Sequence, residues 1–186
     1  MISKIQFCFS HNVKIKGWEE MTFTPGFNLL VGPNGSGKST VLRALHTCEK
    51  CEKQEENLGN THYFNVEMMN PHSFTGVVGD MRNMVLRTRG IFSSHGEIMK
   101  AALASLPIQQ GDLLLVDEPE SGQDAAGVEC IRKGFEAICS KGCQVIAASH
   151  HPFMWEEAHI IELVPGYMKQ VRKKYCTYIC SDQRFE

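Results

Sequence analysis

The stretch GPNGSGKST at residues 32–40 decides the fold, because a short apolar run precedes it and a helical pattern follows it. The preceding run FNLLV (27–31) is typical of a buried strand, and apolar residues recur at helical spacing in VLRALHTCEK (41–50). The stretch matches the phosphate-loop pattern GxxxxGK[ST], whose glycines let backbone amides face anionic oxygens beside a helix N-terminus. Strand, glycine-rich loop and helix in this order predict a phosphate-binding α/β domain.

The side chains of this loop predict a nucleotide bound together with Mg²⁺. Lys38 is expected to reach the β and γ phosphates, and the Ser39 hydroxyl is expected to bind the metal. The predicted nucleotide-binding residues are Asn34, Gly35, Ser36, Gly37, Lys38, Ser39 and Thr40.

A second apolar run, LLLV (113–116), ends in the adjacent acids Asp117 and Glu118. A run of this kind is typical of a buried parallel strand whose carboxylates emerge at its C-terminal end. Asp117 is then placed to bind Mg²⁺, and Glu118 to polarise the attacking water as a general base. An isolated pair of this kind would be two solvated acids, but the phosphate loop argues for the metal and the base.

The remaining pattern alternates strands with helices and predicts an α/β fold with a largely parallel sheet. Extended stretches at 2–9 and around 20–23 are expected to pair as antiparallel strands, and the polar, charged stretch 49–60 is expected to end in a surface loop. Further strands are expected at 61–68, 144–149 and 159–164, helices at 97–106 and 125–140, and a small, partly helical subdomain at 73–90.

The composition is that of an ordinary globular domain, with 186 residues, 42% hydrophobic, 22% charged and a formal charge of −2. No apolar run approaches the ~18 residues of a membrane span, and the N-terminal residues lack the apolar core of a signal peptide. We therefore expect a cytoplasmic protein without membrane contact. The basic run Lys169, Arg172, Lys173 and Lys174 leaves DNA contact open, although a solvated face is the favoured interpretation.

Eight cysteines in a chain without secretion signals are expected to be reduced thiols. Cys48 and Cys51 form a CxxC, which supplies only half of a tetrahedral zinc site, although His46 or His62 could contribute if the fold brought them near. We therefore do not expect zinc at Cys48 and Cys51.

The order of the motifs resembles that of the ATP-binding-cassette (ABC) ATPase superfamily. The motifs are GPNGSGKST as Walker A, SSHGE (93–97) as a variant signature, LLLVDEPE (113–120) as Walker B, SGQD (121–124) as the D-loop and SHHP (149–152) with His150 as the switch histidine. The resemblance implies a P-loop NTPase fold over nearly the whole chain. We expect one ABC-type domain over residues 1–186, with a reduced helical subdomain inserted at about 58–106.

The resemblance also implies a mechanism that needs two heads. In this family two heads enclose two ATP molecules, and the signature of one head closes the site of the other. The residues expected to act across the pair are Ser94, His95, Gly96 and Glu97 of the signature, with Asp124 coupling the sites. Lys38, Glu118 and His150 are the expected catalytic residues, and hydrolysis would release the pair, so that ATP acts as a clamp and a timer.

Within the superfamily, Glu120 and the short interval from Thr40 to Ser94 resemble soluble heads rather than transporter subunits. Those heads serve chromosome maintenance, recombination repair and phage defence of the overcoming-lysogenization-defect type. The leading interpretation is an ATPase that pairs with itself or with an effector protein to regulate a partner in DNA repair or anti-phage defence. The alternatives are an ATP sensor that does not hydrolyse and, less favoured, the ATP-binding subunit of a transporter.

The sequence departs from the family pattern at the Q-loop, because no glutamine lies between Gln54 and Gln109. Glu67, Asn70 and His72 are the candidates to replace it. No aromatic residue is assigned to the adenine.

Overall fold

The computed structural model describes residues 1–65 and 107–181. Four predictions lie outside these residues: the helix at 97–106, the subdomain at 73–90, the Q-loop candidates and the signature residues Ser94, His95, Gly96 and Glu97. No helix in the described ranges is both long enough and apolar enough to cross a membrane.

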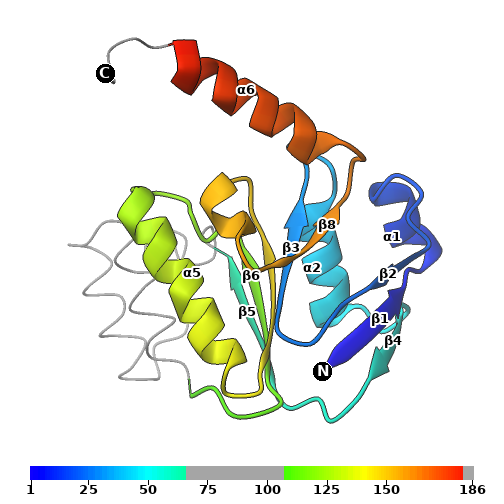
Figure 1. The fold of residues 1–186 in the computed structure, drawn as a ribbon. Helices are drawn as coiled ribbons and strands as arrows, with labels where there is room; N and C mark the ends of the chain where they lie inside the picture. Colours follow the sequence, from blue (N-terminus) through cyan, green and yellow to red (C-terminus); the bar gives the residue numbers. More distant parts are fainter. Residues whose placement is uncertain (66–106, 182–186) are drawn as a thin grey trace, which may run out of the picture.

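Five parallel strands form the central sheet, as predicted, in the spatial order β5-β6-β7-β3-β8 (Figure 1). Their bounds are Phe27–Val31 for β3, Thr61–Asn65 for β5, Leu113–Asp117 for β6, Gln144–Ala148 for β7 and His159–Glu162 for β8. Strand β3, the first strand of this sheet in chain order, lies between β7 and β8, which come late in the chain. The C-terminal ends of β3, β6 and β7 therefore lie side by side, which brings the phosphate loop next to the two predicted acids.

Alternate residues of the sheet belong to two separate cores. Leu30, Leu115 and Ile146 pack on the face that α2 (Lys38–Thr47) covers, while their strand neighbours pack on the opposite face. Helix α5 (Ala125–Cys139) and the short 3-10 helix η2 (Pro152–Trp155) cover that second face. Because helices cover both faces, the strands read as continuous apolar runs rather than as alternating patterns. The chain then continues into α6 (Tyr167–Ser181), which runs across the C-terminal side of the sheet (Figure 1).

A separate antiparallel sheet of three strands lies beyond α2 (Figure 1). Strand β1 (Ile2–Gln6) is central, and β2 (Glu20–Thr22) and β4 (Glu52–Glu55) are its edges. The polar stretch 49–60, for which the sequence predicts only a surface loop at its end, contains strand β4. This strand is polar and largely exposed, and its pairing with β1 rather than any apolar pattern makes it a strand.

The first predicted strand also ends earlier than its apolar alternation suggested. It stops at Gln6, and the chain forms α1 (Phe9–Lys14) before β2 begins. Cys8 has extended backbone at the N-cap, and its carbonyl accepts from the amides of His11 and Asn12. The helix is six residues long and none of them is buried. Hydrophobic periodicity therefore carries no signal for it.

The two sheets are joined by a buried glutamine at the start of β7. The Gln144 side chain accepts from the amide of Ile2 at 2.7 Å and donates to the Ile2 carbonyl at 2.8 Å. The same amide group donates to the carbonyl of Thr24 at 3.0 Å. These bonds fix the N-terminal sheet against the sheet that carries the phosphate loop.

Candidate functional site

The phosphate loop connects β3 to α2 through two glycines in the left-handed region. Gly35 has φ +73° and Gly37 has φ +102°. A Cβ at Gly37 would lie 2.8 Å from Cγ2 of Ile15, so both the backbone conformation and the available space require glycine there. The carbonyl of Gly37 accepts from the amide of Val41 and starts the helix. The free amides of the first turn then face the loop, as an anion-binding site requires.

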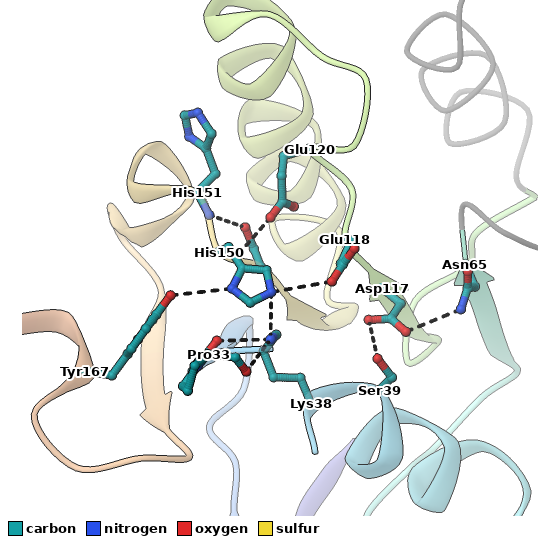
Figure 2. Close-up of polar contacts among 12 residues, drawn as sticks. Pro33, Lys38, Ser39, Asn65, Asp117, Glu118, Glu120, His150, His151 and Tyr167 are labelled. Carbon is teal, nitrogen blue, oxygen red and sulfur yellow. Dashed lines mark hydrogen bonds and ion pairs between the residues drawn. The ribbon is translucent and has the colours of Figure 1, made fainter. Parts of the chain in front are cut away.

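Lys38 is held at the centre of the site by contacts with three polar groups (Figure 2). Its Nζ donates to the carbonyls of Gly32 at 3.0 Å and Pro33 at 3.3 Å, and lies 2.8 Å from Nε2 of His150. Burial lowers the pKa of Lys38, while nearby carboxylates, Glu118 first, raise it in part. The predicted phosphate-binding lysine and the predicted switch histidine are therefore in direct contact, although 112 positions separate them.

A hydroxyl and a carboxylate meet at the start of α2. Ser39 Oγ donates to Oδ1 of Asp117 at 3.1 Å, and Nδ2 of Asn65 donates to Oδ2 of the same carboxylate at 3.4 Å. Asp117 is 4% exposed, and burial raises its pKa above the ordinary range. These oxygen donors are of the kind that Mg²⁺ prefers, so the residues present fit the metal that the sequence predicts.

Glu118 stands at the strand end in a conformation unusual for a residue with a side chain. Its φ is +50°, and its amide donates to the Ala148 carbonyl at 2.9 Å. Its Oε1 lies 3.5 Å from Nε2 of His150, on the side of the imidazole that also contacts Lys38 (Figure 2). A strained backbone of this kind costs about 1–3 kcal/mol and is typical of functional sites.

Two further residues position His150, and neither had been assigned a role in the site. Oε1 of Glu120 accepts from the His150 amide at 2.7 Å, and the hydroxyl of Tyr167 lies 3.5 Å from Nδ1 of the ring. The sequence marks Glu120 only as a departure from the transporter pattern. Tyr167 lies beyond β8, and no motif marks it. The ring is thus bordered by groups from three different parts of the chain.

The adjacent His151 has a different role. Its amide donates to Ser149 Oγ at 3.0 Å, and Nδ1 accepts from the amide of Phe153 at 3.3 Å, which caps η2. Figure 2 shows this ring turned away from His150 and Lys38. His151 is therefore a natural control for His150.

The D-loop aspartate has a local structural role in the single chain. Oδ1 of Asp124 accepts from the Gly127 amide at 2.7 Å and caps the N-terminus of α5. Its expected role between two heads stays a prediction.

An open pocket of about 340 Å³ lies against the loop. The predicted residues Asn34, Gly35, Ser39 and Thr40 contribute to its lining, together with Glu118. Lys14 of α1 and Arg43 of α2 add positive charge that sequence reasoning missed. Arg43 lies one helical turn after the loop, so the helical spacing could have predicted that it faces the pocket. Lys14 lies before the loop, and no sequence pattern predicts its position. Ser36 is buried beside Gly32, and its hydroxyl has no partner among residues 1–65 and 107–181.

Comparison with known proteins gives one family match and several relatives. A family described as an AAA domain matches residues 6–70. An uncharacterized ABC transporter ATP-binding protein of Methanocaldococcus jannaschii is 32% identical over 71 residues, 38% of this chain and 28% of the relative. The zinc import ATP-binding protein ZnuC of Alcanivorax borkumensis is 26% identical over 157 residues, 70% of this chain and 61% of the relative.

A short match and a solved structure complete the comparison. Over 28 residues, 15% of this chain and 8% of the relative, the chain is 61% identical to the DNA replication and repair protein RecF of Erwinia tasmaniensis. The fold is similar, with TM-score 0.51 and 18% identity over 77% of this chain and 83% of the other, to the ATP-binding cassette MJ0796 in a dimeric post-hydrolysis state bound to ADP and Pi.

In sequence and fold the chain is similar to ABC-type ATPases. Its parallel core sheet and separate antiparallel strands match those of its structural neighbours, which confirms the predicted fold class. The head spans 28% and 61% of the length of the first two relatives.

Proposed function

We propose that this ABC-type head binds and hydrolyses ATP with Mg²⁺, and that ATP brings two heads together to regulate a partner protein. The observation that carries the proposal is the contact of Lys38 with His150 and of His150 with Glu118, at 2.8 Å and 3.5 Å. A phosphate-loop lysine, an imidazole and a carboxylate thus lie in contact, and the lysine and the carboxylate line one pocket. This set can bind phosphate oxygens, sense the terminal one and accept a proton.

Each residue has a task that follows from its contacts. Lys38 Nζ is held by two loop carbonyls, so it can exchange them for phosphate oxygens with little movement of its buried stem. Glu118 is half exposed at the pocket and is the carboxylate available to accept the proton of the attacking water. Ser39 and Asp117 would hold Mg²⁺, which would neutralise charge on the phosphates. Asn65 donates to the carboxylate of Asp117 and so fixes the orientation of that group. Among the described residues, Asn65 is therefore the one that could act beside the metal as a Q-loop residue would.

Pairing of heads is supported by the dimeric post-hydrolysis state of the structural neighbour. In the single chain Asp124 faces its own helix, and the pocket is open beside the loop. A second head, supplied by this chain or by an effector, would close the pocket through Ser94, His95, Gly96 and Glu97.

The process served is proposed as DNA repair or anti-phage defence, supported by the short match to RecF and by Glu120 in Walker B. A second candidate is the ATP-binding subunit of a transporter, because ZnuC matches over 70% of the chain. Co-purification of a membrane-spanning partner would favour the second candidate. DNA affinity at low salt that charge reversal of Lys169 and Lys174 abolishes would favour the first.

The first experiment compares ATP turnover and mass in solution for the wild type, Glu118→Gln and His150→Ala, with His151→Ala as the control. We expect Glu118→Gln to lose about 10²–10⁴-fold in kcat and to accumulate as an ATP-bound pair. His150→Ala should lose turnover, whereas His151→Ala should keep it. If the wild type binds ATP but does not hydrolyse it, and its molecular mass in solution stays that of a single chain, the chain is a sensor and the proposal is wrong.

A further inference from the structure

Two segments that are distant in the sequence place three thiols and one imidazole together beside α2. Cys8 and His11 lie at the start of α1, and Cys48 and Cys51 lie just after α2. Their four ligand atoms all lie within 4.8 Å of one another. We propose that this cluster is a structural zinc site with three cysteine ligands and one histidine ligand.

Two of the separations between the donors are close to those that one tetrahedral zinc ion imposes. With Zn–S near 2.3 Å and Zn–N near 2.1 Å, two sulfurs lie about 3.8 Å apart and a sulfur and a nitrogen about 3.6 Å apart. The Sγ atoms of Cys8 and Cys48 are 3.9 Å apart, and Nδ1 of His11 is 3.6 Å from Sγ of Cys51 and 3.1 Å from Sγ of Cys8. The first two of these separations match the zinc values, and the third is shorter.

The backbone around the cluster is also that of a zinc site. Each half has the spacing ligand-x-x-ligand, with Cys8 at the N-cap of α1 and Cys48 at the C-cap of α2. The amide of Cys8 donates to Sγ of Cys51 at 3.4 Å, a contact that supports a metal-bound thiolate. Cys51 is 5% exposed and the other three donors are half-buried. A metal ion bound there would be partly shielded from water.

The donor set selects the metal. Three soft thiolates and an imidazole around one point favour zinc over the hard cations Mg²⁺ and Ca²⁺, which take oxygen ligands. A set of four protein ligands leaves no open position, which is the mark of a structural rather than a catalytic zinc site.

The fold shows what the metal would hold in place. Helix α1 has only six residues and buries none of them, and its side chains Phe9 and Val13 are 84% and 61% exposed. So short a helix is not stable by itself, and its two large apolar side chains are not packed against the core. Its following residue Ile15 packs against Gly37, and Lys14 lines the pocket, so a zinc ion would tie this segment to the far end of the phosphate-loop helix.

This proposal departs from the sequence expectation that Cys48 and Cys51 do not bind zinc. His46 and His62, the sequence candidates for the missing half of the site, have other contacts: the ring of His46 packs against Tyr63, and Nε2 of His62 bonds Asp112 at 3.1 Å. The second pair comes instead from the N-terminus, about 40 residues earlier in the chain.

The test is metal content and cobalt spectroscopy of the whole chain, purified without chelator. We expect one zinc per chain, and we expect the cobalt-substituted protein to show the strong visible bands of tetrahedral geometry with thiolate charge transfer. Cys48→Ser should reduce the bound zinc about tenfold or more. Cys130→Ser removes an exposed cysteine on α5 outside the cluster and should keep the full amount.

A second variant keeps the test decisive if Cys48→Ser fails to fold. His11→Cys retains four donors, so it should still bind cobalt, with stronger charge transfer because a fourth thiolate replaces the imidazole. A spectrum identical to that of the wild type would exclude His11 as a ligand and overturn the site as proposed.

Two other results would overturn the proposal. One is a chain purified under reducing conditions that carries no zinc and takes up neither zinc nor cobalt. The other is a Cys8–Cys48 disulfide in place of metal in the native protein, shown by mass spectrometry. These measurements need no ATP, so failure of the zinc site and failure of the proposed ATPase are distinguished.

Discussion

Gln144 is the buried link between the two sheets, and Gln144→Leu should lower the free energy of unfolding by about 2–4 kcal/mol. The side chain bonds both the amide and the carbonyl of Ile2, at 2.7 Å and 2.8 Å, and Gln144 is fully buried. Leucine has a similar volume but cannot replace either bond. Each buried backbone group left unpaired costs about 1–3 kcal/mol, and the added apolar contact offsets a part of that sum.

The third hydrogen-bond partner of the Gln144 side chain does not add to this loss. The carbonyl of Thr24 also accepts from Nδ2 of Asn28 at 2.7 Å, so it stays bonded in the variant. The predicted cost therefore comes from Ile2 alone, and through it from the attachment of β1 to the sheet of the phosphate loop.

The assay is urea unfolding of the wild type and the variant, monitored by circular dichroism. Both curves are fitted with the same dependence of the unfolding free energy on urea concentration. Gln170→Leu on the exposed face of α6 is the matched control and should change the free energy by less than about 0.5 kcal/mol. If Gln144→Leu were as stable as this control, the two sheets would be held together by other contacts and the reasoning would be refuted.

Three further predictions concern single carboxylates. Asp124→Ala should destabilise the chain by about 1 kcal/mol through loss of the α5 cap, measured by urea unfolding, and an unchanged midpoint would show that the cap is dispensable. Burial opposes ionisation of Asp112, but donated hydrogen bonds, first from the Gln109 amide, outweigh it and hold its pKa below the ordinary value of 3.8. Asp112 therefore contributes stability above that pH which is lost as the pH falls through its lowered pKa, and Asp112→Asn should flatten this acid limb of the stability curve. The pKa of buried Asp117 is raised, so its ionised form opposes folding at neutral pH. Asp117→Asn should therefore leave the nucleotide-free protein at least as stable as the wild type, while it abolishes Mg²⁺-dependent ATP binding. A large loss of stability in this variant would contradict the predicted sign.

The sequence alone determined the core sheet and the position of the phosphate loop. FNLLV, LLLV and QVIAA are buried on both faces, so their apolar runs carry the signal locally, and the loop needs glycines at fixed offsets from its lysine. Such features depend on neighbours in the chain and are readable from it.

Only the tertiary structure decided which distant residues meet. Lys38 contacts His150 because the sheet order places β3 beside β7, and β4 is a strand only because β1 pairs with it. Cys8 and His11 join Cys48 and Cys51 because α1 folds back onto the end of α2. The physical reason is that periodicity and turn chemistry act over a few residues, whereas these contacts are set by strand order and by packing between elements far apart in the chain.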